Sequence, residues 1–332
     1  MGLDVLEDQY VFIGGVGRSG TSIVRKLLAA NHTVAAFPFE YRFIIDPDGI
    51  VDYLTASTNN WSPYIADKRL KRLEKLLLGL GRKKKIPHFV GEIIRSSNVF
   101  RRYISADAYH GWELEEHFPN YFKHVETLLV ELCEFQFSAT WAGAESFKVN
   151  NIVKYSPPRE VSDVYLIFSR FLLSLFHGLL EECGKKILVE DNTWNLLFVD
   201  PLSRLFPNSR FIHVYRDPRD VVCSYREQRW MPSDLSQSAI ICRDLYLQIL
   251  NNLSSMSDQK ILSVSLEELV NNQKQTVLSL ASFCGIDEVE PMLQFPLSNE
   301  SIGRWKKELT KSELIELEPI LKDITERLGY AW

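Results

Sequence analysis

A glycine-rich turn between an apolar run and an amphipathic pattern constrains this chain most. Residues 10–13 are apolar and rich in strand-forming side chains, and residues 21–30 have helical spacing of their apolar positions. Residues 14–20 between them are mostly glycine and small residues. A strand, a tight turn and a helix in this order bring backbone N–H groups and the positive end of a helix to one point. The segment therefore predicts a site for an anion.

The spacing of the glycines leaves the kind of anion open. Gly15, Gly17 and Gly20 fit the dinucleotide pattern G-x-G-x-x-G, and Glu40 lies about twenty residues beyond, where that fold places its ribose acid. Gly15, Gly20 and Ser22 also fit the outline of a P-loop. A second half of a nicotinamide site is not evident in the sequence, which weakens the dinucleotide interpretation.

The side chains of the turn separate these interpretations further. A nucleoside-triphosphate hydrolase carries a lysine at position 21 to neutralise the β- and γ-phosphates, and this chain has Thr21. The turn instead offers one cation and several hydroxyl and amide donors, which suits a phosphosulfate, whose terminal sulfate bears less charge and reacts without a metal. We expect the ligand to be held by five consecutive residues: Arg18, Ser19, Gly20, Thr21 and Ser22.

The rest of the chain predicts an α/β fold with a central parallel sheet flanked by helices, P-loop-like in arrangement. Strand patterns occur at residues 34–39, 186–190, 210–215 and 260–264, and helix patterns at 195–205, 218–226, from 266 onward and 311–328, the last with a Thr310–Glu313 capping box. We expect residues 1–332 to form a single domain. Residues 47–185 read as a large, mostly helical insertion that shapes the site of a second ligand.

Composition excludes several classes of protein. With 38 basic and 43 acidic residues the formal net charge is −5, which argues against a general nucleic-acid binder. The five cysteines are scattered, so neither a zinc site nor a disulfide framework is expected. We expect no other bound metal either. The first apolar run is too short for a signal peptide, and residues 164–180 carry Arg170 and His177. We expect residues 164–180 to form a buried core helix and not a membrane span, and we expect a cytoplasmic protein. Nothing in the sequence indicates the oligomeric state.

A second motif follows the strand at 210–215. Residues 215–225 read Y-R-D-P-R-D-V-V-C-S-Y, with Arg216 ending a strand and Ser224 about two turns into the next helix, so both side chains can converge on one phosphate. This motif and the R-S-G-T-S turn together resemble the 3′-phosphate signature and the 5′-phosphosulfate loop of the sulfotransferase family. The resemblance implies 3′-phosphoadenosine 5′-phosphosulfate (PAPS) as donor, with Arg216 and Ser224 on its 3′-phosphate.

The resemblance extends to the C-terminal part, with two departures. Residues 266–270 (L-E-E-L-V) and 301–306 (S-I-G-R-W-K) are similar to family segments, which implies that Ser301, Arg304 and Lys306 complete the 3′-phosphate pocket. Where the family often has E-K-T-P, this chain has E-D-N-T at 190–193, so Asp191 replaces a lysine near the transferring sulfate. Leu266 replaces a tyrosine. The similarity covers the first 40 residues and residue 186 onward.

The resemblance also implies a sulfotransferase that acts on a hydroxyl or amine of an organic or carbohydrate acceptor. Glu40, 22 residues beyond Arg18, is the candidate general base, and Arg18 the candidate that stabilises charge on the sulfate. Histidines are the alternative base: His88, His110, His117 and His124, whereas His213 lies within a strand pattern and reads as structural. Aromatic residues of the insertion are candidates for a cap over the acceptor: Trp61, Tyr64, Trp112 and Trp141. A P-loop kinase-like phosphotransferase or a non-catalytic nucleotide-binding module are the alternative functions.

Overall fold

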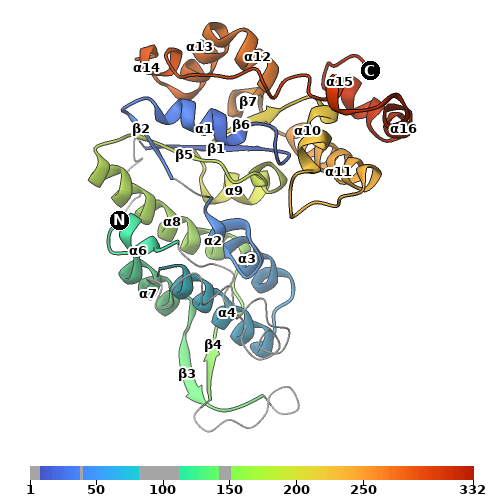
Figure 1. The fold of residues 1–332 in the computed structure, drawn as a ribbon. Coiled ribbons are helices and arrows are strands. Elements are labelled where there is room, and N and C mark those ends of the chain that lie inside the picture. The colour runs from blue at the N-terminus through green and yellow to red at the C-terminus, as the bar shows by residue number, and fades with distance from the viewer. Residues whose placement is uncertain (1–7, 38–39, 82–111, 142–150) are drawn as a thin grey trace, which may run out of the picture. The chain divides into compact units, whose positions relative to one another are not determined.

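The computed structural model describes residues 8–37, 40–81, 112–141 and 151–332, which divide into two compact units (Figure 1). The first, called the sheet unit here, combines Met1–Tyr41 with Cys183–Trp332. The second, the helical unit, is Arg42–Glu182. Some sequence predictions lie outside the described residues: the end of the strand at 38–39, His88 and His110.

The sheet unit is built on a five-stranded sheet in the order β2-β5-β1-β6-β7, with every neighbouring pair parallel. Its strands are β1 Gln9–Gly15, β2 Val34–Ala36, β5 Ile187–Glu190, β6 Arg210–Tyr215 and β7 Ile261–Ser265. All five fall where the sequence predicts strands, and the predicted α/β class is confirmed. Both faces of a parallel sheet are covered by helices, so its strands are mostly apolar.

Side chains alternate between the two faces of this sheet. Val11 and Ile13 of β1 belong to one buried cluster with residues of α1 (Thr21–Ala29) and α13 (Gln273–Cys284). Tyr10 and Phe12 point to the other face, where their rings lie 5.2 Å and 5.1 Å from that of Phe206. The sheet thus has a core on each side, which fixes the position of its strand ends.

Helices cover both faces and one flank of the sheet unit (Figure 1). Besides α1 and α13 they are 3-10 helix η2 Asn195–Leu197, α9 Val199–Leu205, α10 Pro218–Tyr225, α11 Leu235–Leu253, 3-10 helix η3 Asp258–Lys260, α12 Leu266–Asn271, α14 Glu290–Leu293, α15 Trp305–Glu308 and α16 Lys311–Arg327. The predicted capping box is confirmed: the Thr310 side chain accepts from the Glu313 N–H, and the Glu313 carboxylate accepts from the Thr310 N–H. The helix predicted over 195–205 is interrupted, since η2 precedes α9.

The helical unit matches the predicted helical content and adds a hairpin that the sequence did not reveal. Its helices are α2 Arg42–Ile45, α3 Ile50–Asn59, α4 Pro63–Gly81, α6 Leu114–His117, α7 Tyr121–Leu132 and α8 Val161–Cys183. Antiparallel strands β3 Phe135–Ser138 and β4 Ile152–Tyr155 form the hairpin. Each strand is only four residues long and all of β3 is exposed, so no period-2 burial pattern marks it.

Helix α8 is the predicted apolar helix, three residues longer at each end. Its buried residues include Phe168, which packs 5.5 Å from Tyr53, and Phe176, which stacks 5.6 Å from Phe118. Among the described residues this one helix is long and apolar enough to cross a membrane by length and composition, and 56% of its most apolar window is buried inside the structure. The absence of a membrane span stays a prediction.

The five cysteines are free thiols. Cys223, Cys242 and Cys284 are buried, whereas Cys133 is partly exposed and Cys183 exposed.

Candidate functional site

The turn after β1 requires glycine at specific positions. A Cβ on Gly15 would lie 2.2 Å from the Val214 carbonyl oxygen, so β1 and β6 approach closely only because Gly15 has no side chain. Gly20, which precedes α1, has φ +109°, a conformation that other residues rarely adopt. These two glycines therefore let the chain turn sharply after β1, so that the N-terminus of α1 lies at the carboxyl edge of the sheet.

The other residues of this turn differ in exposure. Arg18 also has positive φ, +69°, and its side chain is exposed. Ser19 is fully buried, and its hydroxyl lacks a hydrogen-bond partner among the described residues. Thr21 is buried and Ser22 exposed at the start of α1, whose first N–H groups have no acceptor within the helix. A buried unsatisfied hydroxyl beside a helix N-terminus fits an anion bound in the turn.

The turn after β6 positions Arg216 by its backbone. The Tyr246 hydroxyl, from α11, accepts from the Arg216 N–H at 3.2 Å and donates to the Arg216 carbonyl at 2.7 Å. Asp217 then caps α10 by accepting from the Arg219 N–H at 2.9 Å, with Pro218 in the first turn as predicted. Arg216 thus stands at a fixed point between the end of β6 and the start of α10.

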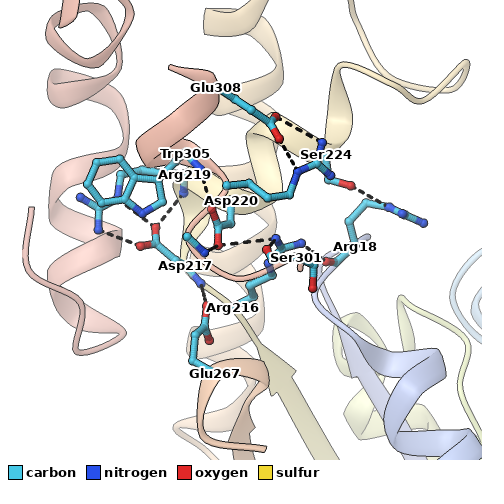
Figure 2. Close-up of polar contacts among 12 residues, drawn as sticks. Arg18, Arg216, Asp217, Arg219, Asp220, Ser224, Glu267, Ser301, Trp305 and Glu308 are labelled. Atoms are coloured by element: carbon cyan, nitrogen blue, oxygen red, sulfur yellow. Dashed lines mark hydrogen bonds and ion pairs between the residues drawn. The ribbon is translucent and has the colours of Figure 1, made fainter. Parts of the chain in front are cut away.

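The Arg216 side chain is buried among acceptors (Figure 2). Its guanidinium donates to the carbonyl oxygen of Arg18 at 3.3 Å and to that of Ser301, and lies 3.5 Å from the Asp220 carboxylate. Its Nε is buried and lacks a partner among the described residues. A buried guanidinium with a donor to spare fits a further anionic ligand.

The two turns touch one another (Figure 2). The Arg18 Nε donates to the Ser224 hydroxyl at 2.9 Å, across 206 residues of sequence. Ser224 is buried on α10, one turn beyond Asp220. The structure therefore brings Arg18, Arg216 and Ser224 together, at the adjacent carboxyl ends of β1 and β6, where open α/β sheets bind ligands.

A loop before α15 is fastened to the start of α10. The Asp220 carboxylate accepts from the Gly303 N–H at 2.7 Å and from the Trp305 N–H at 2.9 Å. The Arg219 guanidinium lies 3.9 Å from the Trp305 ring centroid, a cation–π contact, and is paired with Asp217 at 2.7 Å. This loop brings the Ser301 carbonyl oxygen to the Arg216 guanidinium; that Ser301 completes a phosphate pocket stays a prediction.

The remaining two residues predicted for this pocket have other contacts. Arg304 pairs with Glu308 at 2.6 Å and with Glu227 at 2.8 Å, and these hydrogen bonds hold the pKa of its guanidinium above the ordinary value. Lys306 is exposed, with its ammonium 5.6 Å from the Trp305 ring centroid. No contact of either with Arg216 or Ser224 is seen among the described residues.

The candidate base, Glu40, follows β2 in the chain and lies beside the end of β5. The Thr193 hydroxyl donates to the Glu40 carboxylate at 3.3 Å. Asp191, which stands where the family has lysine, is buried and lies 3.0 Å from the Arg25 guanidinium. Burial raises the pKa of the neighbouring Glu190 to about 8, even though donated hydrogen bonds oppose that shift.

Several contributors were missed by sequence reasoning. Asp220 had a signal, because it follows Arg216 by four residues at the start of a helix. Glu267 lies in the family-like segment 266–270, but that segment does not reveal its contacts: it accepts from the Asp217 N–H at 3.0 Å and from the Tyr330 hydroxyl at 2.6 Å. Leu266, the departure from the family tyrosine, is buried, and its side chain would lie 3.0 Å from a Cβ on Gly20.

The described histidines have the following surroundings. His213 is buried in β6, where desolvation lowers its pKa to about 4 and its ring stacks 5.4 Å from Tyr215. Burial also lowers the pKa of His124, on α7 of the helical unit. His117 ends α6 in the same unit. No group of three or more His, Cys, Asp or Glu arranged to hold a metal occurs within the described part of the chain.

Comparisons with known proteins agree with the sequence resemblance. The model of the sulfotransferase family matches residues 10–291. Similar solved structures include the sulfotransferase domain of the Synechococcus PCC 7002 olefin synthase (13% identity, TM-score 0.47, 98% of this chain and 96% of that one) and that of the curacin biosynthetic pathway (14%, 0.47, 96% and 97%). A third is sulfotransferase STF9 from Mycobacterium avium (12%, 0.44, 99% and 79%). No curated protein sequence matched.

Proposed function

Because the chain belongs to the sulfotransferase family, we propose that it moves a sulfuryl group from PAPS to a hydroxyl or amine of an organic or carbohydrate acceptor. The observation that carries this proposal is the contact between Arg18, Arg216 and Ser224. These side chains come from two strand-to-helix turns that the sequence separates by about 200 residues. The pairing of these two turns suits one nucleotide that carries an anionic group at each end.

The β1 turn would hold the phosphosulfate. In this proposal the amide of Gly20 and the first N–H groups of α1 donate to its oxygens, with the hydroxyls of Ser19, Thr21 and Ser22. The buried Ser19 hydroxyl supports this assignment, since it has a hydrogen bond still to make. Arg18 would neutralise charge on the sulfate and on the bridging oxygen as the bond breaks, which requires its side chain to give up the hydrogen bond with Ser224 on binding.

The β6 turn would hold the 3′-phosphate. The spare Nε of Arg216 and the Ser224 hydroxyl supply one charged and one neutral donor. Ser301 lies beside Arg216 through its carbonyl oxygen, so its loop borders this pocket. Arg304 and Lys306 are proposed to join on binding, which for Arg304 requires exchange of its contacts with Glu227 and Glu308.

Glu40 is the proposed general base. Transfer requires the acceptor oxygen or nitrogen in line with the bridging oxygen of PAPS. As the new bond to sulfur forms, Glu40 takes the acceptor proton, and the bond from sulfur to the bridging oxygen breaks. The electron pair of that bond leaves with 3′-phosphoadenosine 5′-phosphate (PAP). The Thr193 hydroxyl, 3.3 Å from the Glu40 carboxylate, supports a fixed orientation for this base.

Calorimetry with PAP tests the donor site. Arg216→Lys keeps the charge but loses the planar guanidinium, and we expect PAP affinity to fall at least tenfold. Ser224→Ala loses one hydroxyl, and we expect PAP affinity to fall about fivefold. Arg243→Ala, which removes an exposed arginine paired with Asp244, is the matched control. Wild-type affinity in both site variants, with unfolding midpoints unchanged, would refute the pocket.

Transfer of labelled sulfate from PAPS across a panel of hydroxyl and amine acceptors tests the reaction. Glu40→Gln should retain PAP binding and lose turnover by about a hundredfold or more. PAP binding without transfer to any acceptor would favour the non-catalytic module instead. Magnesium-dependent phosphoryl transfer from ATP would favour the phosphotransferase. The acceptor role of residues 47–185 and the cytoplasmic location stay predictions.

A further inference from the structure

The short segment that carries Glu40 is held at both of its described ends. At one end the Arg25 guanidinium, from α1, donates to the Phe37 carbonyl oxygen at 2.7 Å. At the other end the Glu190 carboxyl group accepts from the Tyr41 N–H at 2.9 Å. The rings of Phe37 and Tyr41 also meet edge to face, 4.7 Å apart. Glu40 therefore sits directly beside a fixed point of the backbone.

Glu190 is itself rigidly placed. It is the last residue of β5, is 3% exposed, and accepts from the Asn192 N–H at 3.0 Å as well as from Tyr41. Its second oxygen accepts from the Asn195 amide, which also donates to the Ile13 carbonyl oxygen at 2.9 Å. The Tyr41 backbone is thus tied through one buried carboxyl group to the centre of the sheet.

Asp191 holds the other attachment. Its carboxylate lies 3.0 Å from the Arg25 Nε, and the two side chains are 5% and 13% exposed. Removing one partner of such a pair leaves a buried charge uncompensated, so each fixes the other. Asp191 therefore keeps Arg25 in position to bind the Phe37 carbonyl oxygen, at the position where the family has a cation for the sulfate.

Thr193, two residues after Asp191, contacts the carboxylate of Glu40 directly. Thr193 donates to it at 3.3 Å, and the Thr193 carbonyl oxygen accepts from the Gly15 N–H at 3.0 Å. Thr193 thus connects the proposed base to the last residue of β1, where the proposed sulfate-binding turn begins. A base and a sulfate held from one short segment keep a constant separation, which in-line transfer requires.

We infer that Glu190, Asp191 and Thr193, together with Arg25, are positioning residues that hold Glu40 against the sulfate-binding turn. In this chain the E-D-N-T segment orients the base instead of supplying a cation to the sulfate. This inference rests on the proposed function, since it assigns these residues to the base of that reaction. The charge on the sulfate is then stabilised by Arg18 and by the amide and hydroxyl donors of the β1 turn.

A double-mutant cycle with Glu40 tests the inference. Thr193→Val should lower kcat about fivefold and Asp191→Asn about tenfold, with PAP affinity and acceptor KM unchanged, because only the orientation of the base is affected. Thr193→Ser, which keeps the hydroxyl, should restore wild-type kcat. In the Glu40→Gln background neither substitution should lower kcat further, since the group that they orient is gone.

Matched controls are available on the surface of the sheet unit. Asp244→Asn breaks an exposed pair with Arg243, and Thr276→Val removes a hydroxyl on α13; both should leave kcat unchanged. Full additivity in the Glu40→Gln background, or wild-type kcat in both Thr193→Val and Asp191→Asn, would overturn the inference and leave the proposed function intact. Undiminished kcat in Glu40→Gln itself would remove the proposed base and the inference together.

Discussion

The ends of β6 and β5 both carry a run of charged residues, and the two runs are used differently. After β6, Arg216 and Asp220 contact the loop before α15, and the intervening residues cap and flank α10. At the end of β5, Glu190 binds the Tyr41 backbone, 149 residues away, and Asp191, the next residue, binds Arg25. The first run is a contiguous motif whose roles follow from its own spacing. The second acquires its role only through partners that the fold supplies.

The largest expected effect lies after β5 and concerns pH. The pKa of Glu190 is about 8 in the folded chain against an ordinary value of 4.5, and burial is the main cause. Between these values the folded chain holds one more proton than the unfolded chain. The contribution of the Glu190 carboxyl group to stability is therefore complete below pH 4.5 and is lost as pH rises from there through 8.

Glu190→Gln removes this titration. The free energy of unfolding of the wild type, minus that of the variant, should fall by about 1.4 kcal/mol per pH unit within that window, measured by urea unfolding at several pH values. Glu318→Gln, which removes an exposed carboxylate paired with Lys322 on α16, is the control and should show no such slope. Parallel stability curves for wild type and Glu190→Gln would mean that Glu190 is ionised in the folded chain.

The next effect lies after β6. Asp220→Ala removes the acceptor of the Gly303 and Trp305 N–H groups and leaves the buried Arg216 without its carboxylate. We expect a loss of about 3 kcal/mol in the free energy of unfolding, measured in urea, and at least a tenfold loss of PAP affinity. Asp244→Ala, at an exposed pair, should change stability by less than about 0.5 kcal/mol. Unaltered PAP affinity in Asp220→Ala would separate the loop from the nucleotide site.

Trp305 gives a smaller effect at the same place. Its ring lies 3.9 Å from the Arg219 guanidinium, and such a contact contributes about 1–2 kcal/mol when partly desolvated. Trp305→Leu should lower the free energy of unfolding by about that amount in urea, whereas Trp305→Phe should lose less because it keeps an aromatic face. Equal losses in the two variants would indicate that packing volume, rather than the cation–π contact, holds this loop.

Much of the fold was readable from the sequence, because each strand of the sheet is apolar and lies between recognisable turns. The sequence also predicted that Ser224 and Arg216 lie near one point, since one ends a strand and the other faces it from a helix, and both contact Arg18; their role in binding stays a prediction. The hairpin of β3 and β4 was not readable, because its exposed four-residue strands carry no burial period. Nor were the contacts of Arg25 with the Phe37 carbonyl oxygen and of Glu190 with the Tyr41 N–H, because a backbone group leaves no complementary side chain to find in the sequence.

The smallest effect concerns Arg304, the predicted pocket residue that the structure pairs with acidic neighbours. Glu227, which is 61% exposed, is one of them, so Glu227→Gln should change the free energy of unfolding by less than about 0.5 kcal/mol. It should nevertheless raise PAP affinity about two- to threefold, because Arg304 then has to break one ion pair instead of two when it binds a phosphate. Calorimetry at low and high salt measures both the gain and its screening.

A matched control decides whether that gain belongs to Arg304. Asp323→Asn removes the same charge from a surface pair with Arg327 and leaves Arg304 alone. An equal gain in this control would reduce the effect to the net charge of the protein. If Arg304→Gln lowers PAP affinity and also abolishes the gain from Glu227→Gln, Arg304 binds the nucleotide in competition with its acidic partners. The sequence motif would then be correct about the residue, and Glu227 would be the local charge that reduces its contribution.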